Sequence, residues 1–564
     1  MRRKLFTVLM ALLLTVTSLA GCASTISGTP GSASPDPSGT AVSGDTPKTI
    51  TIAEGSNFVG GFASIYGPDQ GGSSLSYYHY VGNFYESLVN YDNGEIKPGL
   101  AESWKISDDG LVYTFNLRKG VKFSDGTDFN AEVVKLNLQN FSTVMGKGAV
   151  NYGLLNSLIK DVVAVSDDVL EIHLTQPYYA ALTNLAMVMP RGIMAVSAYN
   201  EDGTLSEAVK AGTLGTGPYM YTGDNKNDLE YTFVRNPYYS GEKPQVDGFT
   251  VKVIPDNEAK VLALRNGEVD LIAGSDNISY SSYIQLDAEE QYTGKVSGTH
   301  ILTEFLAVNP EAAPFDDIKV RQAVNQALNK QSIAKDLFGG LKTAADTIMD
   351  TALPYCDISV TPYAYDAAKA KGLLEEAGWV DSDGDGVREK NGTPLAVELK
   401  YVTNDTNDKA MLAIQQNLSE IGMKVTLAGM DLMAFFSIYN GDSYAMAYFE
   451  SYGILYDPFT FVSNMNPNLD YTKASYSTDP MVSKALSNLS YDEAYELTGG
   501  LLSLASDDKI TERFHYLLEK AHENGVLVPV TYRNELAVFS SKTISDYTFF
   551  GQPAQVNVAG VKIK

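Results

Sequence analysis

Alternating apolar and polar residues predict several strands in the first half of the chain. In the stretch 111–117, every second residue is large and apolar, namely Leu111, Tyr113, Phe115 and Leu117. This two-residue period is typical of a half-buried strand. Arg-Lys-Gly at 118–120 predicts a turn, and the apolar run resumes at 121–123, so we expect a β-hairpin. Turn-forming Asn-Pro and Gly-Glu-Lys-Pro sequences separate two further expected strands at 231–234 and 249–254.

From about residue 300, expected strands alternate with expected helices. Residues 302–308 and 395–401 are strand-like, whereas apolar residues recur at helical spacing from Val320 to Leu328 and from Met411 to Ile421. A further helix is expected between an Asp366 N-cap and Gly378. The strand 395–401, the helix after it and the strand 423–427 predict a βαβ unit with parallel strands and a right-handed crossover. This half is therefore expected to be an α/β lobe.

The N-terminus has the features of a lipoprotein signal. Three basic residues precede an apolar stretch at 6–16 that is too short to span a bilayer, and Leu-Ala-Gly stands directly before Cys22. We expect residues 1–21 to be a signal peptide and Cys22 to be lipidated, which would hold the protein at a membrane surface. The alternative is a plain signal peptide in which Cys22 has no role. Residues 22–47 are rich in Ser, Thr, Gly and Pro, so a flexible tether is expected there.

Composition narrows the class of protein. The 564 residues exceed what one hydrophobic core serves, so two or three lobes are expected. The net charge of −26 disfavours binding to nucleic acid and to anionic lipid. Of the two cysteines, lipidation of Cys22 would leave Cys356 alone, so no intrachain disulfide is expected. No segment after the signal has the length and apolarity of a transmembrane helix.

Short motifs occur along the chain from about residue 50 to 540. They are Pro98-Gly99-Leu100-Ala101-Glu102-Ser103-Trp104, the stretch 113–126, Gly215-Thr216-Gly217-Pro218-Tyr219, Arg235-Asn236-Pro237-Tyr238-Tyr239, Leu264-Arg265-Asn266-Gly267-Glu268-Val269-Asp270, Val320-Arg321-Gln322-Ala323 and Glu376-Ala377-Gly378-Trp379. These motifs and their order along the chain resemble those of the extracellular solute-binding proteins of family 5. This family is the peptide/nickel class that serves ABC importers. The resemblance implies an α/β, two-lobed periplasmic-binding-protein fold of class II, cluster C type, with a two-strand hinge and an extra domain inserted in the first lobe.

The resemblance also implies a domain plan and partners. Lobe I would comprise 48–300 and 532–564, with the inserted subdomain at roughly 90–213, and lobe II would comprise 301–531. The hinge strands would lie near 302–309 and 526–538. We expect a monomeric, extracytoplasmic, lipid-anchored binding protein without enzyme activity or cofactor. It would enclose a ligand between its lobes and deliver it to ABC permease subunits with their ATPase.

Within the family, the framework resembles the nickel-chelate binders most, through residues 345–347, 353–357 and 452–458. In that subgroup the last of these segments lines the cleft with aromatic side chains. Ordinary core packing is the alternative for each aromatic candidate. The ligand-binding candidates are Tyr78, Tyr152, Arg191, Phe436, Tyr452, Tyr456 and Asp457.

Two ligand classes stay open: a short peptide and a small, amino-acid-like metal (nickel) chelate. The stretch after Met465 lacks the histidine expected of the nickel subgroup, and the five histidines show no paired metal-ligand spacing, so no residue is assigned as a direct metal ligand. Peptide receptors of the family hold the ligand's ammonium with an acid at the place of Ile454. Glu450 and Asp457 are candidate substitutes, and a turn role is the alternative for Asp457.

Three other functions have partial support in the sequence. The loop 381–386, Asp-Ser-Asp-Gly-Asp-Gly, fits the start of an EF-hand calcium loop, but Gly392 replaces the bidentate Glu of the twelfth position, so a Gly-rich turn is the simpler interpretation. An extracellular enzyme acting on carbohydrate or peptide lacks the Gly-x-Ser-x-Gly, His-Glu-x-x-His and Walker A motifs, although paired carboxylates leave glycoside hydrolysis open. A chemosensory ligand receptor would use the same fold and differ in its partner.

Overall fold

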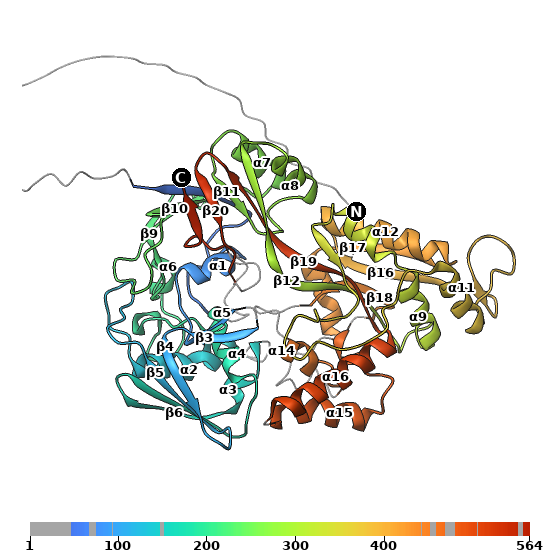
Figure 1. Ribbon diagram of the computed structural model, residues 1–564, viewed down its shortest axis with the longest axis horizontal. Coiled ribbons are helices and arrows are strands. Elements are labelled where there is room, and N and C mark those ends of the chain that lie inside the picture. The colour runs from blue at the N-terminus through green and yellow to red at the C-terminus, as the bar shows by residue number, and fades with distance from the viewer. Residues whose placement is uncertain are drawn as a thin grey trace, which may run out of the picture. The chain divides into compact units, whose positions relative to one another are not determined.

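Two long antiparallel strands, β12 (Tyr292–Val308) and β19 (Leu527–Ser540), lie side by side in the middle of an 11-stranded sheet (Figure 1). The computed structural model describes residues 47–66, 75–92, 94–146, 152–441, 443–451, 458–467, 480–504, 506–550 and 556–564. The strand expected at 302–308 falls within β12, and the stretch 526–538 overlaps β19 from Leu527 onward. Three register shifts interrupt the pairing of β12 with β19 between Val296 and Phe305. The hinge role of these strands stays a prediction.

On one side of this pair, the sheet continues through β11 (Leu271–Ala273), β1 (Thr49–Glu54), β10 (Gly248–Val253), β9 (Glu230–Arg235) and β8 (Tyr219–Asn225). Strand β1 is parallel to both of its neighbours, and β9 is antiparallel to β10 and β8. The strands predicted at 231–234 and 249–254 are therefore confirmed as β9 and β10.

On the other side, the sheet continues through β18 (Met446–Glu450), β16 (Ala396–Val402) and β17 (Lys424–Met430), and β13 (Lys342–Ala344) pairs with β19. Strands β16 and β17 are parallel and are joined by α12 (Asp405–Glu420), so the predicted βαβ unit is confirmed. Asn404 caps α12 because its side chain accepts a hydrogen bond from the Asn407 amide.

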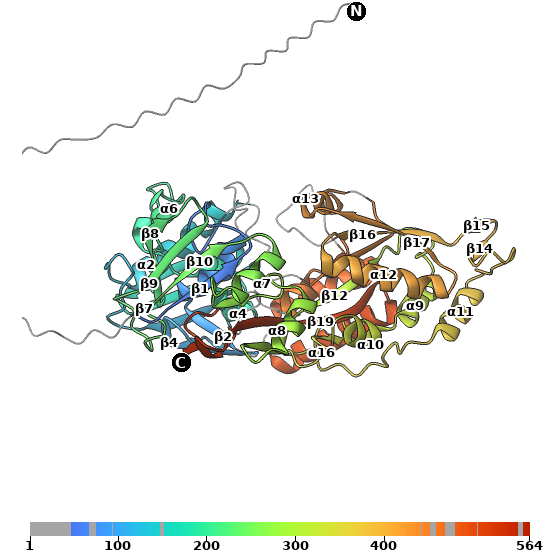
Figure 2. The same ribbon diagram turned by 90° about the horizontal axis from the view of Figure 1, so that it is seen from above.

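The two faces of this part of the sheet pack into two hydrophobic cores. In β12, Phe305 and Ala307 belong to one core, and Leu306 and Val308 belong to the other, as the alternation of side chains along a strand requires. Residues of α9 (Ile318–Ala327), α11 (Ala367–Glu376) and α12, three helices labelled in Figure 2, complete the second core. Residues of α14 (Pro458–Ser463) and α16 (Asp507–Asn524) contribute to the first core. The helix expected after Asp366 is α11, and Asp366 caps it.

A separate four-stranded antiparallel sheet has the order β4 (Ala101–Ile106), β5 (Val112–Leu117), β7 (Val169–Leu174) and β6 (Ile159–Ser166), and α2 (Ala131–Met145) packs on it. The predicted hairpin between 111–117 and 121–123 is wrong, because β5 pairs with β4 and β7 instead. The second stretch turns back on its own continuation, where the Phe129 amide donates to the Val121 carbonyl and the Phe123 amide to the Thr127 carbonyl.

The remaining elements are short. The small strand pairs are β2 (Val89–Asp92) with β3 (Glu95–Pro98), β14 (Glu389–Lys390) with β15 (Thr393–Pro394), and β20 (Ile544–Tyr547) with β21 (Val561–Ile563). The other helices are α1 (Leu75–Tyr80), α3 (Leu155–Leu158), α4 (Ala181–Ala186), α5 (Val188–Arg191), α6 (Ala208–Ala211), α7 (Asn257–Arg265), α8 (Tyr280–Asp287), α10 (Lys330–Ser332), α13 (Leu432–Phe435) and α15 (Tyr491–Gly499).

The Gly-Thr-Gly-Pro-Tyr motif has a packing explanation. A Cβ atom on Gly215 would collide with the carbonyl oxygen of Phe84, and one on Gly217 would lie 2.5 Å from the Phe84 carbonyl carbon. The Gly217 amide donates a 2.9 Å hydrogen bond to the Phe84 carbonyl. Only glycine fits where two backbones approach this closely.

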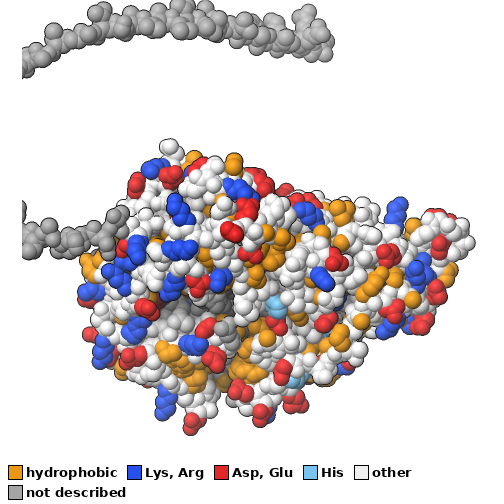
Figure 3. Space-filling model, turned by 45° about the horizontal axis from the view of Figure 1, so that its top comes forward, with side chains coloured by type: hydrophobic (Ala, Val, Ile, Leu, Met, Phe, Trp, Pro, Cys, Tyr) orange, Lys and Arg blue, Asp and Glu red, His pale blue; other side chains and the backbone are white. Residues whose placement is uncertain are grey.

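The surface carries charges of both signs. Acidic and basic side chains are interspersed over the face shown in Figure 3. Within the described ranges, the helices are all too short or too polar to cross a membrane. Cys356 is buried.

Candidate ligand-binding site

Arg533 on β19 joins carboxylates from two other parts of the chain. Its Nη1 atom lies 3.1 Å from Oε2 of Glu450, at the end of β18, and 3.5 Å from Oδ1 of Asp276, in the loop after β11. The Arg533 side chain is only 12% exposed, whereas those of Asp276 and Glu450 are 69% and 41% exposed. One guanidinium therefore faces two carboxylates that both keep open surface.

The charges of this cluster shift the pKa values of its members in different directions. Arg533 lowers the pKa of Asp276 and so keeps that group ionised. Burial raises the pKa of Glu450, and Arg533 opposes that rise only in part because Asp276 and Glu304 repel the Glu450 carboxylate. Burial alone would lower the pKa of Arg533, but Glu450 and Asp276 raise it well above its ordinary value.

A buried ion pair lies directly behind Arg533. Lys342 on β13 donates to both carboxylate oxygens of Glu304 on β12, and Thr531 on β19 donates a 2.5 Å hydrogen bond to Oε2 of Glu304. The Lys342 ammonium also lies 4.2 Å from the centre of the Phe338 ring. Burial would raise the pKa of Glu304, but Lys342 and Arg533 hold it below its ordinary value.

A third group of polar side chains connects β1, α1 and α7. The His79 Nδ1 atom lies 3.0 Å from Oε2 of Glu54, and the Asn277 side-chain amide donates to the same oxygen at 3.4 Å. Lys260 donates to Oδ1 of Asn277 at 2.7 Å. Burial would lower the pKa of His79, but the Glu54 carboxylate raises it above its ordinary value.

A cavity of about 400 Å³ opens beside the Arg533 cluster. This volume is in the range of sites for small ligands. The lining brings together both signs of charge, aromatic rings and polar groups at the start of α12. It includes Asp276, Tyr280, Asn404, Tyr448, Glu450 and Arg533. Such a mixture suits an amphoteric ligand better than an apolar one.

The charges of this cluster influence the pKa of one aromatic candidate, Tyr78. Burial raises the pKa of Tyr78, and the nearby Tyr152, Glu535 and Glu450 raise it further, while Arg533 opposes them. Membership of both tyrosines in the ligand site stays a prediction.

Arg191, at the end of α5, is buried and bonded within the fold. Its Nη1 atom donates to the Tyr152 carbonyl at 2.8 Å, and its Nη2 atom donates to Oδ1 of Asn156 at 3.0 Å. The guanidinium carbon lies 4.4 Å from the centre of the Phe141 ring. Burial lowers the pKa of Arg191 to about 10. The structure therefore places Arg191 behind Tyr152, where it positions the backbone of that candidate.

The structure does not place the other candidates in this cavity. Phe436 follows α13 and is 36% exposed, and it is not among the residues that line the cavity. Tyr452, Tyr456, Asp457 and the lipidation candidate Cys22 lie outside the described residues. Their roles stay predictions.

A second cavity, of about 370 Å³, has several aromatic residues in its lining. Tyr179 packs against Tyr355 with ring centres 5.4 Å apart, and Tyr178 packs against Phe459 at 5.7 Å. The charged residues of its lining, Asp108 and Asp507, are both acidic. Because oppositely charged groups do not converge there, the cavity beside Arg533 is the stronger candidate site.

Comparison with known proteins decides the family. Residues 95–473 match the family model described as "Bacterial extracellular solute-binding proteins, family 5 Middle". The chain belongs to this family. The predicted resemblance and the predicted fold class are thereby confirmed.

Relatives of the family 5 protein include the "Nickel-binding periplasmic protein" of Escherichia coli, which is 32% identical over 80% of this chain and 84% of its own. The "Glutathione-binding protein GsiB" of Salmonella choleraesuis is 31% identical over 68% of this chain and 70% of its own. Among solved structures, NikA from Brucella suis, in complex with Fe(III)-EDTA, has a TM-score of 0.83 and 29% identity, and covers 92% of this chain and all of its own. The family 5 protein is thus a solute-binding protein of the class that serves ABC importers.

Sequence reasoning did not find the central charges of the family 5 site. The sequence indicates Glu450 as a partner for an ammonium, but it does not single out Arg533, Asp276, Glu304 or Lys342. A usable signal exists in β12, since Glu304 stands in the mostly apolar and buried run 301–308. Charged residues in such runs require partners or a ligand.

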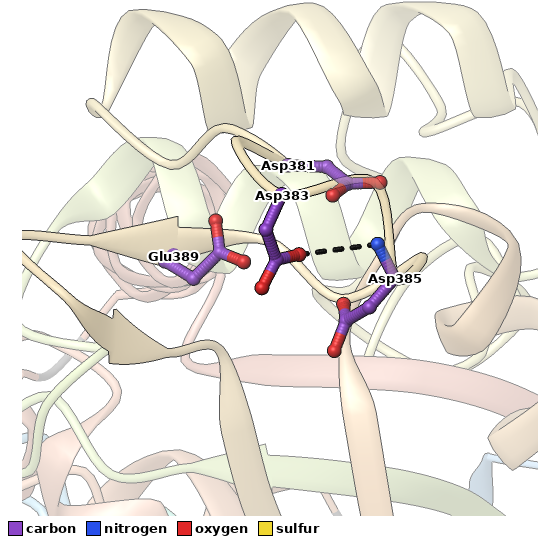
Figure 4. Close-up of side chains that lie close together, drawn as sticks. All are labelled: Asp381, Asp383, Asp385 and Glu389. Carbon is purple, nitrogen blue, oxygen red and sulfur yellow. Dashed lines mark hydrogen bonds between the residues drawn. The ribbon is translucent and has the colours of Figure 1, made fainter.

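The acidic loop after α11 lies apart from this site. In Figure 4, the carboxylates of Asp381, Asp383, Asp385 and Glu389 face one another, and their oxygens lie within 4.8 Å. Asp381 accepts from the Gly384 amide at 2.8 Å, Asp383 from the Asp385 amide at 3.1 Å, and Glu389 from the Ser382 amide at 3.0 Å. These bonds are those of a tight acidic turn.

Proposed function

We propose that this family 5 protein captures a short peptide or a small, amino-acid-like nickel chelate in the cavity beside Arg533. It then delivers the ligand to ABC permease subunits with their ATPase, and it does not alter the ligand chemically. The observation that carries the proposal is the convergence of Arg533, Glu450 and Asp276 on one cavity of ligand size. Charges brought together from β11, β18 and β19 give a small polar ligand contacts with several parts of the chain at once.

The relatives support both ligand classes. One relative is named for nickel and another for glutathione, which is itself a short peptide. Tyr78 and Tyr152 would add stacking surface and hydroxyl groups for either ligand.

The histidines favour a chelated metal over a bare one. His79 bonds to Glu54, His173 to Glu171, His300 to Asp350, His515 to Asp357 and His522 to the Thr361 carbonyl. No two of these described histidines share a partner. Nickel would therefore enter with donor atoms supplied by its chelator.

The lipid anchor is a separate part of the proposal. It is supported by the basic residues, the apolar stretch and the Leu-Ala-Gly-Cys sequence at the N-terminus. Lipidation at Cys22 would keep the protein outside the cytoplasm and close to its permease.

Native mass spectrometry of the purified protein, with metal analysis of the same sample, tests the ligand. A co-purifying peptide of a few residues supports the peptide class, and nickel with a small organic chelator supports the other class. Calorimetric titration with trialanine, glutathione and nickel–L-histidine then measures affinity. If neither method detects a ligand of these classes, the proposed function is wrong.

A further inference from the structure

The second cavity, of about 370 Å³, is lined by rings from segments that lie far apart in the sequence. Its lining has no residue in common with the lining of the cavity beside Arg533. The volume is in the range of sites for small ligands, so the two cavities are separate candidate sites. The aromatic residues of the second lining are Tyr91, Tyr113, Tyr178, Tyr179, Tyr355 and Phe459.

Three of these rings meet at one corner of the second cavity. Tyr179, in the segment before α4, packs against Tyr355 with ring centres 5.4 Å apart and an angle of 80° between the ring planes. Tyr179 also lies 6.1 Å from Phe459 on α14, measured between ring centres. Because the faces of aromatic rings carry partial negative charge, rings set at an angle to one another around one space attract a cation.

The backbone of Tyr355 indicates that the fold maintains the position of its ring. The φ angle of Tyr355 is +63°, in the left-handed region that bulky residues seldom adopt. Strained backbone of this kind persists only where the surrounding structure requires it. The ring contacts both Tyr179 and Phe514, whose ring centres lie 5.4 and 5.6 Å away. These contacts keep the Tyr355 ring in the wall of the cavity.

The charge of the second cavity has one sign. Its charged residues are Asp108, in the turn between β4 and β5, and Asp507, at the start of α16. Among the described residues, the lining holds no Lys, Arg or His. Burial, together with the Asp507 carboxylate, raises the pKa of Tyr355 to about 12, so its hydroxyl is neutral at pH 7. An anion would be repelled there, and a cation would be attracted.

We propose that the second cavity binds an organic cation whose charge lies on a quaternary alkylammonium group. The alkyl groups of such an ion would pack against the ring faces, and Asp108 and Asp507 would supply the opposite charge. A quaternary nitrogen has no proton to donate, so ring faces satisfy it, whereas a primary ammonium needs three acceptors. This site is separate from the cavity of the proposed function and does not depend on it.

Calorimetry with choline and 3,3-dimethylbutan-1-ol tests the class of ligand. The two molecules have the same shape, but only choline is charged. Choline should bind the wild-type protein in the millimolar range or below. Its affinity should exceed that of the neutral alcohol by about tenfold or more, because the attraction of ring faces and carboxylates acts on the charge alone.

The variants Tyr179→Leu and Asp507→Asn test the residues. Tyr179→Leu keeps an apolar side chain but removes a ring face, and it should weaken choline binding by about fivefold or more. Asp507→Asn removes one charge and should weaken binding by about threefold or more at low ionic strength. Tyr179→Phe keeps the ring and should bind choline as the wild type does.

The matched control for the charge is Asp508→Asn. Asp508 lies beside Asp507 in the first turn of α16 but does not belong to the lining, so its replacement should leave choline binding unchanged. Thermal unfolding of each variant checks that the fold is retained. If Tyr179→Leu does not fold, Asp507→Asn and the pair of probes on the wild type decide the outcome.

Several results would overturn the proposal and leave the proposed function standing. They are the absence of choline binding, equal affinity for choline and the neutral alcohol, and wild-type affinity in either folded variant, Tyr179→Leu or Asp507→Asn. Loss of choline binding in Glu450→Gln would also overturn it, because the cation would then lie in the cavity beside Arg533.

Discussion

Lys342 Nζ lies 2.7 Å from Oε1 and 2.6 Å from Oε2 of Glu304, and both side chains are buried in the sheet. The two residues belong to β13 and β12, which pair with opposite edges of β19. The ion pair therefore ties three strands together next to the ligand cavity.

Removal of one partner of this pair should be strongly destabilising. Lys342→Met leaves the Glu304 carboxylate buried without its cation, and we expect a loss of about 3–5 kcal/mol in the free energy of unfolding. The double variant Lys342→Met/Glu304→Gln should recover part of that loss, because no uncompensated charge remains. Urea unfolding measures both variants. A loss under about 1 kcal/mol for the single variant would contradict the importance of the pair.

Ligand binding should weaken at mildly acidic pH. Burial raises the pKa of Glu450 above its ordinary value of 4.5. As the pH falls below 7, a growing fraction of this carboxylate is therefore protonated. A protonated Glu450 no longer attracts an ammonium. Calorimetry of trialanine at pH 7 and pH 5 should show lower affinity at pH 5. The Glu450→Gln variant should show a smaller difference between the two pH values.

The fold itself should persist at that pH. The pKa of Glu304 is lowered in the folded state, so its contribution to stability is present above the unfolded-state value of about 4.5 and is lost as the pH falls through the folded-state value. A thermal unfolding curve at pH 5 serves as the control. If the protein were already unfolded at pH 5, the change in affinity could not be assigned to Glu450.

The motif glycine Gly215 should not tolerate a methyl group. The Cβ of Gly215→Ala would meet the Phe84 carbonyl oxygen, a backbone atom that cannot move aside, and we expect a loss of about 1–3 kcal/mol or more. Gly212→Ala is the matched control, since a Cβ atom there has nothing within 4 Å. Thermal unfolding should separate the two variants clearly, and equal stability would exclude the packing explanation.

The tyrosines of the segment 452–458 are predicted to contact the ligand. Replacement of both Tyr452 and Tyr456 by Ala should weaken binding by about tenfold or more, because aromatic contact area is lost, and should leave the unfolding temperature nearly unchanged. Calorimetry and thermal unfolding of the same preparation test this. Undiminished affinity would remove both residues from the site.

Membrane attachment is predicted to depend on one thiol. Cys22→Ala should move the protein from the membrane fraction to the soluble fraction, because the lipid chains have no other attachment point in the predicted signal. Fractionation with immunoblotting measures the change. Cys22→Ser provides a second variant of similar size, and retention of either variant at the membrane would be inconsistent with a lipid anchor at this position.

The sequence predicted the elements whose pattern is local. The strand 395–401, its helix and the next strand were predicted correctly because their apolar periods and caps lie within about 35 residues. The hairpin near residue 120 was wrong because β5 takes its partners from β4 and from β7, the latter more than 50 residues away, and a local turn signal carries no information on that choice.

The residues of the candidate site were also only partly predictable, because local patterns do not specify which strands are neighbours. The family resemblance indicates Tyr78 and Tyr152, and both residues stay candidates. The contact between Arg533 and Asp276 joins positions separated by more than 250 residues, and it depends on the order of β11 and β19 in the sheet. Periodicity can place each residue on a strand or a loop, but it cannot specify that order.

The register shifts of β12 against β19 have a mechanical consequence. A β-bulge bends a strand and increases its local twist, and the register shifts here fall between Val296 and Phe305. Arg533 pairs with Leu302, which lies between these register shifts. If these strands act as the predicted hinge, a ligand bound to the Arg533 guanidinium would lie where their pairing is irregular.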